Sequence, residues 1–269
     1  MTGSDVPQHT VAVVLAGGTG ERLGLQVPKQ LLEIGGRSII GHSIQAFEAA
    51  AEIDEIIVLM TPGFTDRAEA IVSAAGHQKV SRVLEGGETR TESTRIAIAA
   101  AGERLHDRGE PESGCKVLFH DAVRPFVDER IITDCVQALD SYDAVAVAIP
   151  SSDTIMVVEG GVISHIPDRT TLRRVQTPQG FRLPVIRTAY ERAMADPGFS
   201  STDDCGVVLR YLPEVPITVV TGSEYNMKIT HPIDVALAGQ LSDLATQQAT
   251  AEAGGAGATP VTRDSRSAQ

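Results

Sequence analysis

The stretch Val11-Ala12-Val13-Val14-Leu15-Ala16-Gly17-Gly18-Thr19-Gly20-Glu21-Arg22-Leu23-Gly24, followed by Pro28-Lys29-Gln30, decides the fold of this 269-residue chain. A β-branched apolar run of strand length passes directly into closely spaced glycines, which predicts a buried strand that ends in a loop. Glycines let successive backbone N–H groups point into one concavity, where they can bind phosphate oxygens. Arg22 and Lys29 would add full positive charges. The loop alone is also compatible with a purely structural tight turn.

Two better-known phosphate-binding patterns do not fit this loop. A Rossmann dinucleotide loop reads G-x-G-x-x-G, whereas Gly18, Gly20 and Gly24 are spaced one residue too long. A Walker loop needs Gly-Lys-Ser/Thr, and Gly20 is followed by Glu21. The loop therefore favours neither a dehydrogenase nor a P-loop NTPase.

Short apolar runs alternate with helix-length segments along the chain, which predicts a Rossmann-like, doubly wound, mostly parallel α/β sheet. The expected strands are Val11–Leu15, Ile56–Met60, Lys79–Leu84, Lys116–Phe119, Ala144–Ile149 and Ile217–Val220. The expected helices are Ser38–Ala51, Thr65–Ala75, Thr91–Leu105, Asp128–Leu139, Pro184–Ala195, Thr202–Tyr211 and Pro232–Ser242.

One segment interrupts this alternation. Asp153 to His165 reads as two strands around Glu159-Gly160-Gly161, which predicts a β-hairpin arm over about 151–172 that projects from the sheet. We expect a flexible N-terminus over 1–10, a single domain over 11–243, and a disordered tail over 244–269. The tail is rich in Ala, Gly, Thr, Ser and Gln and has few large apolar side chains to offset its ordering entropy.

The charge, the N-terminal residues and the cysteines of the chain restrict which partners and which cellular location we expect. The net charge of −12 excludes the broad basic face that nucleic acid or an anionic membrane surface requires. Residues 1–10 lack a basic start followed by an apolar run, so we expect a cytoplasmic protein without a membrane span. Cys115, Cys135 and Cys205 have no C-x-x-C spacing, which predicts buried, reduced thiols.

Two further motifs lie at predicted strand ends, where open α/β sheets bind ligands. In His120-Asp121-Ala122-Val123-Arg124-Pro125, Asp121 can accept from hydroxyls and Arg124 can bind a phosphate, although the two could equally form a structural ion pair. His120 is expected to be structural. Gly86-Gly87-Glu88-Thr89-Arg90 with Ser93 could admit a flat base or be an ordinary strand-to-helix loop.

The order of all these motifs is more specific than any one of them. The Gly-rich loop, Gly-Gly-Glu and His-Asp-Ala-x-Arg-Pro are followed by Asp168-Arg169, Gln176-Thr177-Pro178-Gln179-Gly180-Phe181, Ser201-Thr202-Asp203-Asp204 and Asn226-Met227-Lys228-Ile229-Thr230. This succession resembles the 2-C-methyl-D-erythritol 4-phosphate cytidylyltransferase family from about Val11 to Gln240. Here Leu15-Ala16-Gly17-Gly18 stands where the family often reads Pro-Ala-Ala-Gly, and Glu88 where it often has Asp.

The resemblance implies a role for each motif. Arg22 and Lys29 would stabilise the transition state at the CTP triphosphate, while Lys228 and an Arg169 contributed across a homodimer through the arm would place the sugar phosphate. Mg²⁺ or another divalent cation would be held mainly by the CTP phosphates. Nucleotide contacts are implied for Ala16, Gly17, Gly18, Thr19, Gly20, Gly87, Glu88, Ser93 and Ala122, and polyol contacts for Asp121, Arg124, Thr154, Thr177 and Thr202.

The implied reaction transfers CMP from CTP to a polyol phosphate. The nearest alternative is a ribitol 5-phosphate cytidylyltransferase, which shares the loop and the chemistry. A non-catalytic nucleotide-binding protein is a second alternative, and it would bind CTP without releasing pyrophosphate. On their own, Arg169 and Lys228 could be solvated surface charges.

Overall fold

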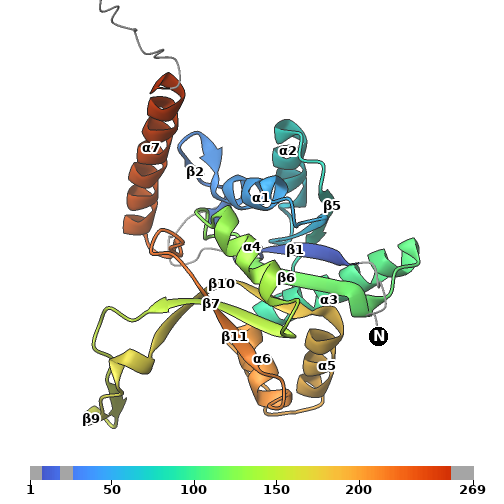
Figure 1. The fold of residues 1–269 in the computed structure, drawn as a ribbon, viewed down its shortest axis with the longest axis vertical. Helices are drawn as coiled ribbons and strands as arrows, with labels where there is room; N and C mark the ends of the chain where they lie inside the picture. Colours follow the sequence, from blue (N-terminus) through green and yellow to red (C-terminus); the bar gives the residue numbers. More distant parts are fainter. Residues whose placement is uncertain (1–7, 19–26, 256–269) are drawn as a thin grey trace, which may run out of the picture.

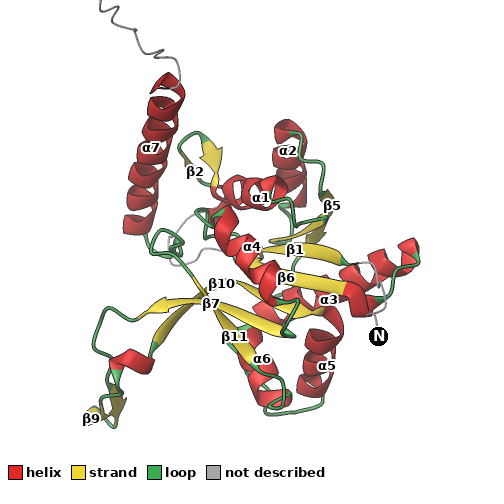
Figure 2. Ribbon diagram, in the orientation of Figure 1, coloured by secondary structure: helices red, strands yellow, loops and turns green. Residues whose placement is uncertain are grey.

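The computed structural model describes residues 8–18 and 27–255, with side chains described as far as Leu244. Within these ranges the chain forms a seven-stranded sheet in the order β11-β7-β10-β6-β1-β4-β5. The strand bounds are β1 His9–Ala16, β4 Glu55–Met60, β5 Val80–Glu85, β6 Cys115–Asp121, β7 Ala144–Pro150, β10 Arg173–Arg182 and β11 Ile217–Thr221. The fold is the mostly parallel α/β sheet that the sequence predicts (Figures 1 and 2).

Strand direction decides where a ligand can bind. β1 pairs in parallel with β4 and β6, β4 with β5, and β7 with β11. β10 runs antiparallel between β6 and β7, with Phe181 opposite Ala144 and Arg173 opposite Pro150. The carboxyl ends of the parallel strands therefore share one edge of the sheet, and β10 begins at that edge.

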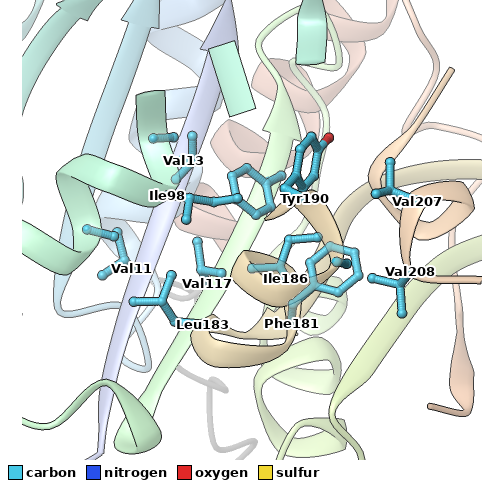
Figure 3. Packing of buried hydrophobic residues seen from close by; sticks show 14 of the residues in the cluster. Val11, Val13, Ile98, Val117, Phe181, Leu183, Ile186, Tyr190, Val207 and Val208 are labelled. Atoms are coloured by element: carbon cyan, nitrogen blue, oxygen red, sulfur yellow. The ribbon is translucent and has the colours of Figure 1, made fainter. Parts of the chain in front are cut away.

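Helices cover both faces of the sheet. Their bounds are α1 Ile39–Ala49, α2 Thr65–Ala75, α3 Arg90–Arg108, α4 Glu129–Ala138, α5 Leu183–Met194, α6 Asp204–Tyr211 and α7 Pro232–Gly255. One apolar cluster packs α3, α5 and α6 against the sheet, and Val11 and Val13 of β1 belong to it (Figure 3). The opposite cluster packs α1, α2 and α4 against the alternate residues Ala12 and Val14. This division follows from the two-residue period of β1, which is buried along its whole length.

Local sequence signals set the helix ends. The Thr89 hydroxyl accepts from the Glu92 N–H while the Glu92 carboxylate accepts from the Thr89 N–H, so a capping box starts α3. Asp203 caps α6 by accepting from the Gly206 N–H. Gly76 ends α2 with φ of 68°, a left-handed conformation that favours glycine.

The arm is present as an antiparallel hairpin of β8 Val157–Glu159 and β9 Val162–His165, joined by Gly160 and Gly161, both with positive φ. It extends away from the central sheet (Figure 1). The remaining short elements are the hairpin of β2 Glu33–Ile34 and β3 Arg37–Ser38 and the 3₁₀ turns η2 Lys29–Leu31, η3 Glu112–Gly114 and η4 Arg169–Thr171.

Every strand and helix expected from the sequence is present, but the prediction lacks the short β2–β3 hairpin and differs at β10 and α7. The sequence prediction omitted β10, whose Thr177-Pro178-Gln179-Gly180 segment carries polar and turn-forming residues and a register shift between Gln176 and Gln179. Helix α7 was expected to end at Ser242, with a disordered tail from residue 244, but it continues to Gly255. The prediction was wrong over 244–255 because it weighed burial alone, whereas Ala and Gln there have high helix propensity. Residues 256–269 and 1–7 lie outside the described residues.

The three cysteines are buried free thiols, as expected, and burial raises the pKa of Cys115 and of Cys135 to about 12. In the described part of the chain, none of the helices combines the length and the apolar character that crossing a membrane requires.

Candidate active site

A pocket of about 550 Å³ opens at the carboxyl edge of the sheet. It lies where β1 and β6 end and where β5 passes into α3, the region in which open α/β sheets bind ligands. Its lining comprises Leu15, Ala16, Gly17, Gly18, Lys29, Gln30, Gly87, Glu88, Thr89, Arg90, Ser93, Asp121, Val123, Lys228 and Thr230.

The loop after β1 is held from below by a buried amide. Gln30, only 1% exposed, donates from Nε2 to the carbonyls of Ala16 and Gly18 and to the hydroxyl of Thr61. Thr61 in turn donates to the Ala16 carbonyl at 3.0 Å. Because C=O and N–H point opposite ways across a trans peptide, the N–H of Gly17 points away from Gln30. The side of the loop that faces away from Gln30 therefore offers backbone N–H donors, which an anionic ligand needs.

Ser93 organises the second glycine-rich segment. Its hydroxyl accepts from the Gly87 N–H and donates to the Thr89 carbonyl, both at 3.1 Å. A Cβ on Gly17 would lie 3.2 Å from the Ser93 oxygen, and one on Gly86 would lie 3.0 Å from it and 3.5 Å from the Gly17 Cα. The two loops approach each other this closely because the glycines lack side chains, and both loops line the pocket.

Asp121 is the acidic centre of the pocket. Its side chain is 13% exposed, and Lys228 Nζ donates to Oδ2 at 2.7 Å. Burial disfavours the charged form, but Lys228, Arg90 and, more weakly, Arg124 outweigh it, so the pKa of Asp121 falls to about 2. The carboxylate is thus ionised at neutral pH and held between cations.

Behind Asp121 lies a fully buried histidine. Thr177 accepts from the Asp121 N–H and shares a 3.1 Å hydrogen bond with His120 Nδ1, while His120 Nε2 lies 3.0 Å from the Arg124 carbonyl. Burial, the largest effect, lowers the pKa of His120 to about 4. The ring is therefore neutral at pH 7, with Nε2–H donating and Nδ1 accepting, in keeping with the structural role expected for it.

The pocket brings together most of the predicted site residues that the structure describes. Ala16, Gly17, Gly18, Lys29, Gly87, Glu88, Ser93, Asp121 and Lys228 all line it. The Lys29 ammonium donates to the Ile229 carbonyl at 2.9 Å, which fixes its stem beside Lys228. Thr19, Gly20 and Arg22 lie outside the described residues.

The other predicted residues lie elsewhere in this chain. Buried Ala122 and Thr177 support the pocket from behind, and Arg124 donates to the carbonyls of Asn226 and Val175. Thr154 and Thr202 are exposed, and Arg169 lies on the arm, where it donates to the Ser152 carbonyl at 3.2 Å. Arg169 of the same chain is therefore not part of the pocket.

Gln30 and Arg90 line the pocket, although the sequence prediction assigned them no role. The sequence position of each residue beside a predicted motif could have identified it. Gln30 follows Lys29 directly, and Arg90 closes the Gly-Gly-Glu-Thr-Arg motif. Their importance depends on buried partners, Thr61 for Gln30 and Asp204 for Arg90, which are distant in sequence.

The described residues offer a divalent cation few ligands. Among the described residues no three His, Cys, Asp or Glu side chains form a cluster that could hold a metal ion. The carboxylate of Asp121 is already paired with Lys228. The described residues thus fit a cation whose oxygen ligands come mainly from a bound ligand.

Proteins of one family resemble this chain along most of its length. The family model for 2-C-methyl-D-erythritol 4-phosphate cytidylyltransferase matches residues 10–242. A protein of that name from Thermobifida fusca is 49% identical over 87% of this chain and 95% of its own length. One from Bifidobacterium longum is 42% identical over 87% of this chain and 80% of its own length.

Solved structures agree as well. The 4-diphosphocytidyl-2C-methyl-D-erythritol synthase of Anaerococcus prevotii superposes with a TM-score of 0.75 at 26% identity, covering 87% of this chain and 96% of that one. The 2-C-methyl-D-erythritol 4-phosphate cytidylyltransferase of Thermus thermophilus gives 0.66 at 30% identity, covering 88% and 99%. The chain belongs to the 2-C-methyl-D-erythritol 4-phosphate cytidylyltransferase family.

Proposed function

We propose that the protein transfers CMP from CTP to 2-C-methyl-D-erythritol 4-phosphate, giving 4-diphosphocytidyl-2-C-methyl-D-erythritol and pyrophosphate. Family membership supports the reaction, and one observation supports its assignment to this pocket. Lys29 and Lys228, from opposite ends of the sequence, line one pocket beside a glycine-rich loop in a chain of net charge −12. Local convergence of cations in an acidic protein is what two phosphorylated ligands require.

The proposed chemistry is in-line attack by a phosphate oxygen of the polyol phosphate on the α-phosphorus of CTP. A phosphate monoester has a second pKa of about 6, so the nucleophile is largely deprotonated at neutral pH. No general base is needed, which agrees with a buried His120 whose pKa is about 4 and with the absence of His from the described pocket lining. Catalysis then rests on positioning two anions and stabilising charge on the α-phosphate.

The cations divide between the two ligands. We assign Lys29 and Arg22 to the triphosphate and Lys228 to the polyol phosphate, with Asp121 holding the Lys228 ammonium in place. The part of the pocket lined by Gly87 and Ser93 would bind cytosine. Mg²⁺ would enter on the triphosphate and neutralise part of its charge.

The arm provides the basis for a homodimer. Its side chains Ile155, Met156, Val158, Val162, Ile163 and Ile166 are each 45–70% exposed, a concentration of apolar surface typical of an interface. A second copy that packs there would bring Arg169 of the partner subunit to the pocket. We further propose that the enzyme works in the cytoplasm and that residues 11–243 form its one catalytic domain.

Ribitol 5-phosphate is the second candidate substrate. A bifunctional ribulose 5-phosphate reductase/CDP-ribitol pyrophosphorylase from Haemophilus influenzae is 42% identical over 86% of this chain and 48% of its own length. Because that protein matches nearly as well as several cytidylyltransferases named for methylerythritol phosphate, the polyol pocket has to be tested directly.

Pyrophosphate release with purified full-length protein tests the proposal. We expect release with CTP, Mg²⁺ and 2-C-methyl-D-erythritol 4-phosphate, and much slower release with other nucleoside triphosphates or with ribitol 5-phosphate. Lys29→Ala should lower kcat/KM by a factor corresponding to about 3 kcal/mol, as loss of an oxyanion donor does. Binding of CTP without pyrophosphate release with either polyol would refute the transferase assignment, and full activity of Lys29→Ala would refute its mechanism.

A further inference from the structure

An alternating line of charges runs from the pocket into the interior. Lys228 pairs with Asp121 at 2.7 Å, Asp121 lies 3.7 Å from Arg90 Nε, and Arg90 Nη2 pairs with Asp204 at 2.6 Å. The four residues come from the segment after β11, the end of β6, the start of α3 and the start of α6. The line therefore connects a surface cation of the proposed polyol site with a carboxylate that is fully buried.

Asp204 is the last residue of the Ser-Thr-Asp-Asp motif, and the proposed reaction gives it no role. It is 0% exposed, and Arg90, Thr94 and Tyr190 all donate to its carboxylate, the last two at 3.0 and 2.6 Å. Tyr190 comes from α5, so two helices besides its own hold this group. A buried carboxylate so fully satisfied cannot move without leaving an unpaired charge.

Arg90 is fixed by this arrangement. Its side chain is 29% exposed and lines the pocket, and the neighbouring Asp204, Asp121 and Tyr190 raise its pKa although burial opposes this. The planar guanidinium carries donors at fixed angles, so anchoring Nη2 on Asp204 also sets the direction of Nε. That nitrogen is the one that faces Asp121.

We propose that Arg90, anchored by Asp204, is a positioning residue that fixes the Asp121 carboxylate and through it the Lys228 ammonium for the polyol phosphate. Asp121 has a cation on either side, and each limits where the carboxylate can point. Without Arg90, Asp121 would turn towards Lys228 and Arg124, and the ammonium would no longer be held at one point. The inference rests on the proposed function, in which Lys228 binds the second phosphate.

The kinetic test compares the two substrates in Arg90→Gln. We expect the KM for the polyol phosphate to rise roughly 10-fold or more, since a charge-assisted contact is lost, while the KM for CTP changes less than about 3-fold. A merely structural residue would alter both constants or neither. A rise confined to CTP, or no rise, would overturn the proposal.

Conservative variants separate positioning from folding. Arg90→Lys keeps the positive charge but loses the planar guanidinium. Its KM for the polyol phosphate should lie between those of wild type and Arg90→Gln. Tyr190→Phe removes a single hydroxyl from Asp204 and should raise the same KM by a smaller factor, even where Asp204→Asn fails to fold. Arg82→Gln, which loses a surface pair with Glu103, is the matched control and should leave both constants unchanged. If Arg90→Lys or Tyr190→Phe matches this control, Arg90 is not positioned by Asp204.

A third measurement does not depend on activity. Carbon-13 NMR of labelled Asp carboxyls can follow Asp121, which Lys228, Arg90 and Arg124 face. Removing one of these cations in Arg90→Gln should raise the pKa of Asp121 above its value of about 2, whereas Arg82→Gln should not. An unchanged pKa would overturn the inference. If wild type lacks pyrophosphate release, the proposed function fails, and the NMR result still decides the positioning of Asp121.

Discussion

At the scale of single residues, the site depends on buried side chains that point at backbone. Gln30, which is 1% exposed, donates to two carbonyls of the glycine-rich loop. Ser93, which is 3% exposed, accepts from the Gly87 N–H and donates to the Thr89 carbonyl in the loop after β5. Glycine loops have little side-chain packing of their own, so their conformation is set by such donors. The conformation that presents backbone N–H groups is thus specified by residues that need not touch the ligand.

Gln30→Leu tests this directly. The change leaves the carbonyls of Ala16 and Gly18 without their amide donor, so we expect the KM for CTP to rise roughly 10-fold, with little change for the polyol phosphate. Steady-state kinetics with each substrate varied in turn measures both constants. Gln78→Leu removes an exposed amide that donates to the Gly76 carbonyl and is the matched control. An unaltered KM for CTP in Gln30→Leu would show that the loop holds its shape unaided.

Sequence identified the cations at this scale better than it identified their partners. Lys29, Lys228 and Asp121 were predicted as site residues and do line one pocket, because strand ends collect at one edge of a parallel sheet. Arg124 and Arg90 have the same charge and lie at similar strand ends, yet Arg124 donates to carbonyls and Arg90 lines the pocket. Which arginine faces the pocket is decided by Asp204, more than a hundred residues away from Arg90.

At the scale of elements, β10 is the strand of the central sheet that sequence did not predict. Its neighbours β6 and β7 are apolar and buried along most of their length, so their pattern was sufficient. β10 instead carries Gln176, Thr177 and Gln179, which are buried but hydrogen-bonded to the loop after β11, to β6 and to the start of α6, respectively. A strand whose buried positions are polar lacks the apolar period on which prediction depends.

Gly180 of β10 shows how tightly this strand is enclosed. A Cβ there would lie 2.7 Å from Val145 Cγ1 and 3.1 Å from Leu139 Cδ1, so Gly180→Ala should destabilise the protein by about 1–3 kcal/mol through overpacking. Gly239→Ala is the control, since a Cβ there meets nothing within 4 Å in helix α7, and it should stabilise by about 0.5–1 kcal/mol. Urea unfolding measures both. Equal effects would mean that the sheet relaxes around the added methyl group.

At the scale of the whole molecule, buried ionisable side chains make the stability of the fold depend on pH. Burial lowers the folded-state pKa of His120 to about 4 from the ordinary histidine value of 6.5, so the unfolded chain binds the proton first as pH falls. The stability is therefore complete above pH 6.5 and is lost as pH falls towards 4. Glu55 and Asp121, each with a pKa lowered to about 2, act in the same direction at lower pH, because the unfolded chain binds these protons while the folded carboxylates are still ionised.

We expect wild type to lose roughly 2 kcal/mol of stability to His120 between pH 7 and pH 4.5. His120→Gln should start less stable, since it disturbs the contacts to Thr177 and Arg124, but should show that much less loss over the interval. His42 and His77, whose pKa values are also lowered by burial, will contribute the remainder. Urea unfolding at the two pH values measures this, with exposed His165→Gln as the control. Equal losses in His120→Gln and wild type would contradict the assignment.

The proposed dimer makes a numerical prediction. Homodimers of Lys29→Ala and of Arg169→Ala should each be nearly inactive. If Arg169 acts across the interface, mixing the two by unfolding and refolding together restores one working site in each mixed dimer, or about one quarter of wild-type activity. Pyrophosphate release measures it. No recovery, with mixed dimers demonstrated by mass spectrometry, would mean that Arg169 serves its own subunit.

The antiparallel course of β10 has a consequence for how this protein can be altered. β7 ends at Pro150 and β10 begins opposite it at Arg173, so the segment between them leaves and rejoins the sheet at the same edge. Residues can be added to or removed from the tip of this segment without shifting the register between β7 and β10. The choice of subunit partner can therefore be redesigned, or a foreign recognition loop grafted, as a module separate from the rest of the molecule.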